Sequence, residues 1–184
     1  FYFVVYTFYA YLSAGKKGVR VFWKNVLPTT LTSLATCSSA ACIPVNIDTA
    51  KKIGVPGDIA EAVIPMGTSF HKDGSIIGSV FKIMFLVYLF EGGTFGMDMM
   101  IKVVGIALIS TLLVTAVPIG GGTISESLII SLLGYSMSCL PILTIIATII
   151  DAQETVLNVV GDTSSSMLVS RIVDGKDWMG KEKS

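Results

Sequence analysis

Residues 144–169, TIIATIIDAQETVLNVVGDTSSSMLV, belong to the longest apolar segment of the chain, yet they carry three acids and the amide of Asn158 between them. The polar residues concerned are Asp151, Glu154, Thr155, Asn158 and Asp162. Four of them are spaced 4, 3 and 4 residues apart, so on a helix they share one face, and Glu154 lies beside them. A charge at the centre of a bilayer costs about 2.5–3.5 kcal/mol on insertion scales. The acids therefore need cationic partners, and bound cations are the simplest candidates because they prefer oxygen ligands.

A proton relay or a water-filled vestibule could also account for these acids. A relay would keep some of the carboxylates neutral inside the membrane. In a vestibule the acids would merely be solvated. The segment DTSSS, at 162–166, approaches an aqueous end of the helix and suits a vestibule.

The composition indicates that the solvent of this chain is a bilayer. Of its 184 residues, 52% are hydrophobic and only 14% are charged, whereas soluble domains have about 25% charged residues. The mean hydropathy is +0.75. The formal net charge is zero and no basic stripe is present, which disfavours nucleic acid as a partner. The three cysteines and the lone His71 lack metal-ligand spacing, so we expect no disulfide, no zinc site and no organic cofactor.

Short apolar arms joined by small or polar residues predict an all-α membrane protein with broken and re-entrant helices. The expected segments are the end of a transmembrane helix at 1–14, a basic cytoplasmic loop at 15–24, a first re-entrant hairpin at 25–54, a broken transmembrane helix at 57–91, a second re-entrant hairpin at 98–134, the last transmembrane helix at 139–172 and a cytoplasmic tail at 173–184. The abrupt start at FYFVVY suggests a fragment whose first helix begins outside this sequence.

The positive charges orient these segments. All lysines and arginines except Lys72, Lys82 and Lys102 lie at 16–24, at 51–52 or from residue 171 onward. The positive-inside rule places those three regions in the cytoplasm. Each hairpin is then followed by a crossing segment, and the two hairpins enter from opposite sides.

Such an inverted repeat with broken helices is typical of secondary transporters, whose site lies near the middle of the membrane. The hairpin tips SSAAC and PIGGG are rich in small residues, which suits close approach of backbone to a ligand. The tips could instead be ordinary loops between tightly packed helices. The segment GTSFHKDGSI, at 67–76, contains a turn pair that interrupts an apolar run, and its freed carbonyls could bind ions. A salt bridge between Lys72 and Asp73 is the simpler alternative there.

At these motifs the chain resembles the dicarboxylate/amino acid:cation symporter family, the glutamate-transporter-like carriers. SSAACIP resembles the tip of the first hairpin in that family, and HKDGS resembles the NMDGT break of its seventh helix. VPIGGG fits the tip of the second hairpin, and TVLNVVGD after an aspartate resembles the last helix. The resemblance covers 25–172 and implies an elevator-type transport domain, the C-terminal portion of the carrier, which moves against a scaffold of earlier helices.

The resemblance also implies roles for individual residues. Ser39, with Ser38 beside it, and Asn158 would hold the α-carboxylate of the substrate, and Asp151 and Thr155 its ammonium. Ser75, Glu154 and the backbone at Val117 and Gly121 would complete the substrate site. The sodium ligands implied are Gly67, Asn158 and Asp162 for one ion, Ser69 for another and Asp73, with His71 beside it, for a third. Members of the family are multi-pass proteins of the cell membrane and form homotrimers.

Two departures from the family pattern bear on the substrate and the ions. Members that carry acidic substrates have an arginine at the position of Glu154, where it pairs with the substrate's second carboxylate. A glutamate would repel that carboxylate, and the sequence ETVLN is similar to the serine/threonine:sodium branch. A small neutral amino acid is therefore expected, with cationic, acidic and cystine substrates as alternatives. His71 and Lys72 replace the usual asparagine and methionine, and Lys72 could stand in for one cation.

Other functions stay open. A channel or a proton-coupled carrier could use the same acids without sodium. A membrane serine hydrolase could use Ser38 or Ser39 with His71 and Asp73, although the sequence has no nucleophile elbow. A structural bundle without transport activity is disfavoured because a row of buried acids contributes nothing to packing.

Overall fold

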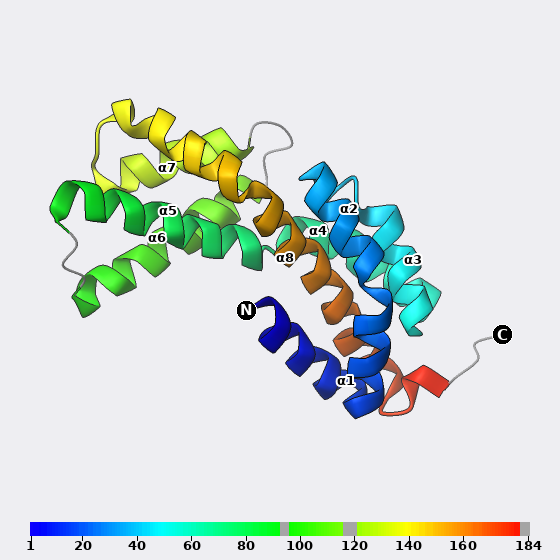
Figure 1. Cartoon of the computed structure of the whole chain (residues 1–184). Helices are drawn as coiled ribbons and strands as arrows, with labels where there is room; N and C mark the ends of the chain where they lie inside the picture. Colours follow the sequence, from blue (N-terminus) through cyan, green and yellow to red (C-terminus); the bar gives the residue numbers. More distant parts are fainter. Residues whose placement is uncertain (93–95, 116–120, 181–184) are drawn as a thin grey trace. The chain divides into compact units, whose positions relative to one another are not determined.

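The structure, a computed structural model, describes residues 1–92, 96–115 and 121–180. Every regular element in these ranges is an α-helix or a short 3₁₀ helix, with no strand among them, so the predicted all-α class is confirmed (Figure 1). The chain divides into two compact units. Unit 1 contains Phe1–Lys72 and Thr155–Ser184, and unit 2 contains Asp73–Glu154.

Unit 1 begins with helix α1, Tyr2–Asn25, which is interrupted inside by non-helical residues. Gly15 has a φ of 61°, a value that favours glycine, and with Ala14 it bends the helix. The sequence predicted a loop over 15–24, but the chain resumes a helix after the bend. Basic residues indicate a side of the membrane rather than a conformation, and buried Phe22, with partly buried Val19 and Trp23, gives this segment an apolar helical face.

Helices α2, Leu27–Thr36, and α3, Ile43–Ile53, follow, each with a proline in its first turn. A hydrogen bond of 2.8 Å between the buried hydroxyls of Thr29 and Thr49 ties them together. The turn between them begins at Cys37, whose φ is 47°. Helix α4, Gly57–Phe70, completes this part of unit 1.

Helix α8, Leu140–Asp174, enters unit 1 at Thr155 and packs there against α1, α3 and α4. The core of unit 1 is formed by Tyr6, Ala10, Phe22, Val26, Ala50, Ile53, Val55, Ile59, Ala60, Ile64, Val156, Val160, Met167 and Trp178. The Tyr6 hydroxyl donates to the carbonyl of Leu157 at 2.6 Å. Buried serines of α8 donate back to their own helix, as Ser170 does to Ser166, so their small side chains need no outside partner.

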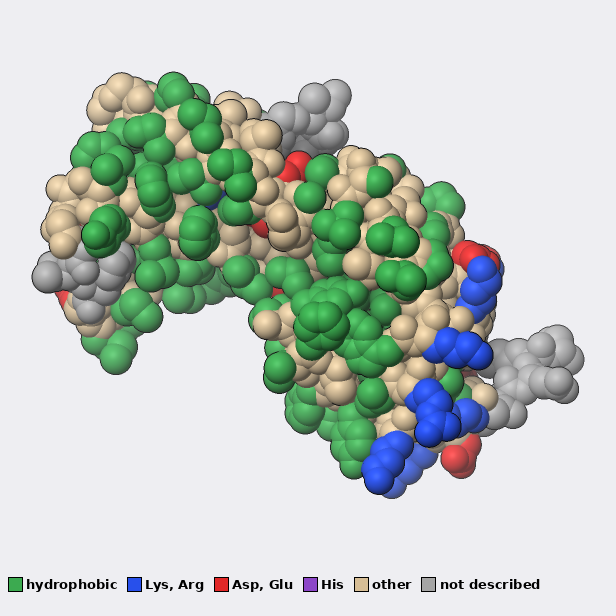
Figure 2. Space-filling model, in the orientation of Figure 1, with side chains coloured by type: hydrophobic (Ala, Val, Ile, Leu, Met, Phe, Trp, Pro, Cys, Tyr) green, Lys and Arg blue, Asp and Glu red, His purple; other side chains and the backbone are tan. Residues whose placement is uncertain are grey.

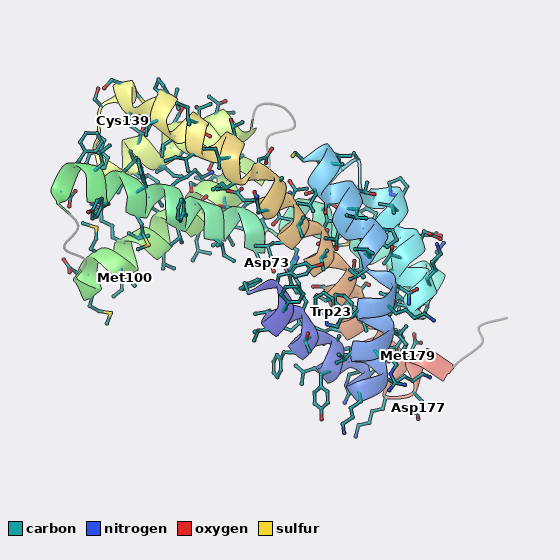
Figure 3. All side chains as sticks on the ribbon, viewed as in Figure 1. Trp23, Asp73, Met100, Cys139, Asp177 and Met179 are labelled. Atoms are coloured by element: carbon teal, nitrogen blue, oxygen red, sulfur yellow. The ribbon has the colours of Figure 1, made fainter. Side chains whose placement is uncertain are left out.

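Residues 175–180, which follow α8, fold back onto the bend of α1. Trp178 is 1% exposed, and its indole donates to the carbonyl of Ser13 at 3.0 Å. Arg171 donates to the same carbonyl at 3.2 Å. The bend at Ala14 and Gly15 breaks the helical hydrogen-bond pattern there, and these two donors use the Ser13 carbonyl. Met179 also packs against the core of unit 1 (Figure 3), so the segment expected as a tail is part of this unit through residue 179.

Unit 2 contains α5, Asp73–Glu91, α6, Met97–Thr115, α7, Gly121–Leu133, the short helix η1, Met137–Cys139, and the first part of α8. Its core is formed by Ile83, Leu86, Val87, Val103, Ile106, Ala107, Ile129, Ile130, Cys139 and Leu143. A polar contact of 3.3 Å between the buried hydroxyls of Ser79 and Thr111 joins α5 to α6.

Three segments are long and apolar enough to cross a membrane: Gly57–Glu91, Met97–Val114 and Met137–Asp174, with mean hydropathies of 1.6, 2.0 and 1.5. Large hydrophobic side chains are exposed on both units, including Phe81, Phe85, Ile109 and Leu113 of unit 2 (Figure 2). In water such an apolar surface would aggregate, whereas in a bilayer it meets lipid or other helices. Lysine and arginine side chains gather on one side of unit 1 in the same view.

Candidate functional site

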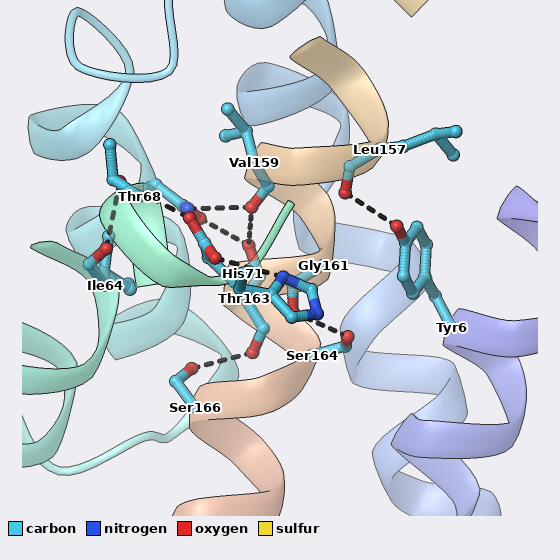
Figure 4. Close-up of polar contacts among 12 residues, drawn as sticks. Tyr6, Ile64, Thr68, His71, Leu157, Val159, Gly161, Thr163, Ser164 and Ser166 are labelled. Carbon is cyan, nitrogen blue, oxygen red and sulfur yellow. Dashed lines mark hydrogen bonds and ion pairs between the residues drawn. The ribbon is translucent and has the colours of Figure 1, made fainter. Parts of the chain in front are cut away.

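Asp162 is fully buried on α8, and its carboxylate meets Thr68 of α4 and His71, the residue that follows α4. Figure 4 shows both of these residues beside Gly161 and Thr163 of α8. The Nδ1 atom of His71 lies 3.2 Å from Oδ1 of Asp162, and the Thr68 hydroxyl donates to Oδ2 at 3.4 Å. The same Thr68 hydroxyl can also donate to the carbonyl of Ile64, which lies 3.0 Å away. A buried carboxylate without such partners would cost several kcal/mol.

Two glycines leave room for this arrangement. A Cβ at Gly67 would overlap Oδ1 of Asp162 and would lie 2.8 Å from its Cγ. A Cβ at Gly161 would overlap the His71 ring and would lie 2.9 Å from its Nδ1. Because neither position carries a side chain, α4 approaches α8 and the imidazole reaches the carboxylate.

An amide from α3 joins the same region. Asn46 is 1% exposed, and its Nδ2 donates to the carbonyl of Val159 at 2.9 Å. Its Oδ1 accepts a hydrogen bond from the Thr163 hydroxyl, the next residue after Asp162. Each such hydrogen bond contributes about 0.5–1.5 kcal/mol net to the stability of the fold. Removing one partner costs more, because the other polar group is then left buried without a hydrogen bond. The amide therefore fixes α3 against the polar turn of α8.

The helical face predicted on α8 is largely buried. Thr155, Asn158 and Asp162 are 5%, 4% and 0% exposed, whereas Asp151 is exposed. The buried members of this face belong to unit 1, and Asp151 and Glu154 belong to unit 2.

Glu154 is paired inside unit 2 with Lys82, which sequence reasoning missed. Oε1 of Glu154 lies 3.7 Å from Nζ of Lys82 on α5, and the two side chains are 15% and 7% exposed. Asp151 interacts electrostatically with both charges. The ion pair lies against Gly78, where a Cβ would lie 2.9 Å from Cγ of Glu154.

A second buried acid of unit 2, Glu126 on α7, accepts a hydrogen bond of 2.7 Å from the Thr144 hydroxyl. Both this residue and Lys82 carry a signal in the sequence. A single lysine inside the run SVFKIMFL requires an anionic partner in a membrane, and an acid within TISESLII requires a donor. Asn46 and Thr68 gave no signal of this kind.

The remaining predicted residues are distributed as follows. Ser38 and Ser39 lie half-buried in the turn between α2 and α3, where the Ser38 hydroxyl accepts from the amide of Ala41 at 3.3 Å. Ser69 is exposed near the end of α4. Asp73 opens α5 (Figure 3), and Ser75 follows it in the first turn. Gly121 opens α7, and Val117 lies outside the described residues.

Within residues 1–92, 96–115 and 121–180, no three His, Cys, Asp or Glu side chains converge to hold a metal ion. The cysteines Cys37, Cys42 and Cys139 are free thiols. A cation in the region of Asp162 would therefore rely on one carboxylate together with hydroxyl, amide and carbonyl oxygens. Such a set of oxygen donors suits a hard cation better than a soft transition metal.

Comparison with known proteins gives a family and several relatives. The family model described as Sodium:dicarboxylate symporter family matches residues 1–172. The "Proton/sodium-glutamate symport protein" of Bacillus caldotenax is 29% identical over 160 residues, which are 84% of this chain and 37% of that protein. The "L-cystine uptake protein TcyP" of Bacillus licheniformis is 26% identical over 158 residues, which are 83% of this chain and 33% of that protein.

The "Neutral amino acid transporter B(0)" of Rattus norvegicus is 25% identical over 165 residues, 89% of this chain and 29% of that protein. The chain thus spans about a third of the length of the curated relatives it matches. No solved structure gives a significant match. All three relatives carry names of transporters, and the substrates in those names differ.

Proposed function

We propose that this chain, which belongs to the Sodium:dicarboxylate symporter family, is the transport-domain portion of a sodium-coupled symporter for a small neutral amino acid. Serine and threonine are the first candidates. The observation that carries the proposal is the acid at position 154, which has a second acid, Asp151, on the same helix and one lysine, Lys82 of α5, as its ion-pair partner. This net negative charge favours a substrate ammonium and opposes a second substrate carboxylate.

The substrate site that we propose combines residues of α8 with the two hairpin tips. Asp151 and Thr155 would bind the ammonium, and Asn158 with Ser38 and Ser39 would bind the α-carboxylate. Ser75, Val117 and Gly121 would complete the site. The exposed position of Asp151 is consistent with a ligand-binding carboxylate, since its charge does not need a protein partner.

The ions would bind around Asp162. We propose that Gly67, Asn158 and Asp162 contribute oxygen atoms to one sodium site and that Ser69 and Asp73 serve further ions, with protons as alternative coupling ions. His71 and Lys72 both act electrostatically on the Asp162 carboxylate. Lys72 thus brings a positive charge near the carboxylate where a cation would bind, which supports a lower sodium count per substrate. Sodium and serine fluxes in the parent and in Lys72→Met test this, and equal ratios would contradict it.

For the complete protein we propose a homotrimer in the cell membrane, with the basic side of unit 1 toward the cytoplasm. The segments at 25–54 and 98–134 would be re-entrant hairpins, and 57–91 and 139–172 would be the crossing segments. Cysteines introduced at Ser38 and at Lys102 test this topology when their accessibility is measured from each side of sealed vesicles.

The experiment that tests the proposed function uses the complete protein in liposomes. Uptake of labelled serine is measured under an inward sodium gradient, with aspartate, threonine, cystine and lysine as competitors. Sodium-dependent uptake that threonine inhibits and aspartate does not is the expected result. Inhibition by aspartate would instead indicate an acidic substrate, and inhibition by cystine would indicate the substrate in the name of the Bacillus licheniformis relative. Uptake that depends on a proton gradient and not on sodium would mean that the coupling ion is the proton.

A further inference from the structure

Lys82 is the one buried lysine or arginine among the described residues, with 6% of its surface exposed. It lies in the middle of α5, inside a segment apolar enough to span a membrane. A lysine in such a segment normally reaches an interface or pairs with an acid. Here it pairs with Glu154, whose Oε1 is 3.7 Å from its Nζ.

The backbone of α5 is shaped for Glu154. Gly74 and Gly78 are one helical turn apart in the sequence GSIIG, a spacing that lets two membrane helices approach closely. A Cβ at Gly78 would overlap the Glu154 carboxylate, and a Cβ at Gly74 would lie 2.8 Å from the carbonyl carbon of Glu154. The contact between Glu154 and α5 therefore depends on both glycines.

Two neighbouring acids, together with Lys82 and Glu154, determine the net charge around this ion pair. Asp151 acts on both members of the pair, and Glu126 acts on Glu154 while it accepts the hydrogen bond from Thr144. Lys82 compensates one of these acids. Without it, Glu154 would be a second uncompensated acid one turn from Asp151, and like charges so placed disfavour binding of any anion.

We propose that Lys82 is a specificity-determining residue that neutralises Glu154 and so sets the charge of the substrate accepted. The inference rests on the proposed function and names a further residue that acts on the proposed substrate site. In the parent protein the ion pair leaves Asp151 to attract an ammonium. Loss of Glu154 alone leaves the Lys82 charge uncompensated by its partner, and loss of Lys82 alone leaves two acids together.

The two single variants should therefore change specificity in opposite directions. Glu154→Gln should raise the potency of aspartate relative to serine as a competitor by about tenfold or more, because the positive charge of Lys82 is then no longer compensated by Glu154 and attracts the second carboxylate of aspartate. Lys82→Met should lower the relative potency of aspartate and raise that of lysine. The double variant Lys82→Met/Glu154→Gln should return the aspartate-to-serine ratio toward the parent value.

The test measures these ratios in the complete protein in liposomes. Lys82→Arg, which keeps the charge, should retain the parent ratio, and Lys102→Met, at an exposed lysine of the same unit, is the matched control. Each ratio is taken within one variant, so a lower amount of folded protein cancels. Shifts in the Tm of the purified protein with serine or with aspartate measure the same preference without transport.

Opposite shifts that cancel in the double variant support the inference. Unchanged ratios in both single variants of a protein that still takes up serine would overturn it and leave the proposed function standing. A parent protein that takes up and binds no amino acid would overturn the proposed function and this inference together.

Discussion

The Nδ1 atom of His71 lies 3.2 Å from Oδ1 of Asp162, a fully buried carboxylate on the last helix. His71 follows the end of α4. Gly67 of α4 lies against Asp162, and Gly161 of α8 lies against the His71 ring. The polar cluster thus depends on two positions that carry no side chain. Where two glycines meet a buried charge, a methyl group added at either one tests the arrangement directly.

Gly67→Ala should reduce the proposed sodium-dependent uptake by about tenfold, because the new Cβ would displace the Asp162 carboxylate and overpacking costs about 1–3 kcal/mol. The measurement is initial uptake at equal amounts of protein in the membrane. Gly105→Ala on α6 is the matched control, since a Cβ there would meet nothing within 4 Å. Equal losses in the two variants, or no loss at Gly67, would contradict the close approach of α4 to Asp162.

Asn46→Ala should lower the free energy of unfolding by about 1–3 kcal/mol, because it leaves the Val159 carbonyl and the Thr163 hydroxyl without their amide partner. Thermal unfolding of the purified protein in detergent measures this. Asn25→Ala serves for comparison, since that amide only donates to Val21 within its own helix, at 2.8 Å. A smaller effect at Asn46 than at Asn25 would show that α3 does not depend on this amide.

Sequence periodicity identified the buried polar face of α8, because Thr155, Asn158 and Asp162 follow the helical repeat and all three are buried. Periodicity says nothing about which distant residue meets that face. The partners of the acids, His71 for Asp162 and Lys82 for Glu154, come from other helices, and their choice depends on how closely those helices approach. Glycines at the contacts control that approach, and the sequence does not reveal which glycines face a neighbour.

The basic segment after Gly15 illustrates a different difficulty. Its charges suit a loop at the membrane surface, but Phe22 and its apolar neighbours bury one face of a helix in unit 1. Similarly, the polar composition after α8 suits a free tail, whereas the buried indole of Trp178 docks the described residues 175–180 on unit 1. One large apolar side chain in a short polar segment is a weak signal in the sequence and a strong one in a packed structure.

Trp178→Phe should lower the free energy of unfolding by about 0.5–1.5 kcal/mol, since the ring remains but its hydrogen bond to Ser13 is lost. The loss is limited because Arg171 still donates to the same carbonyl at 3.2 Å. Trp178→Ala should cost about 3–5 kcal/mol, because a fully buried ring is removed. Both are measured as shifts in thermal unfolding of the complete protein. A Trp178→Ala variant as stable as the parent would mean that the segment is not docked on α1.

Tyr135, in unit 2 between α7 and η1, should titrate well above an ordinary tyrosine. Burial raises the pKa of its phenol to about 12, and the hydrogen bond that it donates to Glu91 at 2.6 Å and the negative charge of Glu91 act in the same direction. The folded state then holds the phenolic proton more tightly than the unfolded state, whose pKa is about 10. Its contribution to stability is complete below pH 10 and is lost as the pH rises toward 12.

The measurement follows the ultraviolet absorbance of tyrosinate while the purified protein is titrated with base. Tyr135→Phe should remove the component that ionises near pH 12 and make the stability of the protein less sensitive to pH above 10. Glu91→Gln should lower the pKa of Tyr135, because the charge that opposes its ionisation is gone while a hydrogen-bond acceptor remains. Tyr88→Phe, at an exposed tyrosine of the same unit, is the control. If Glu91→Gln left the pKa of Tyr135 unchanged, Glu91 would not be the partner of Tyr135 in solution.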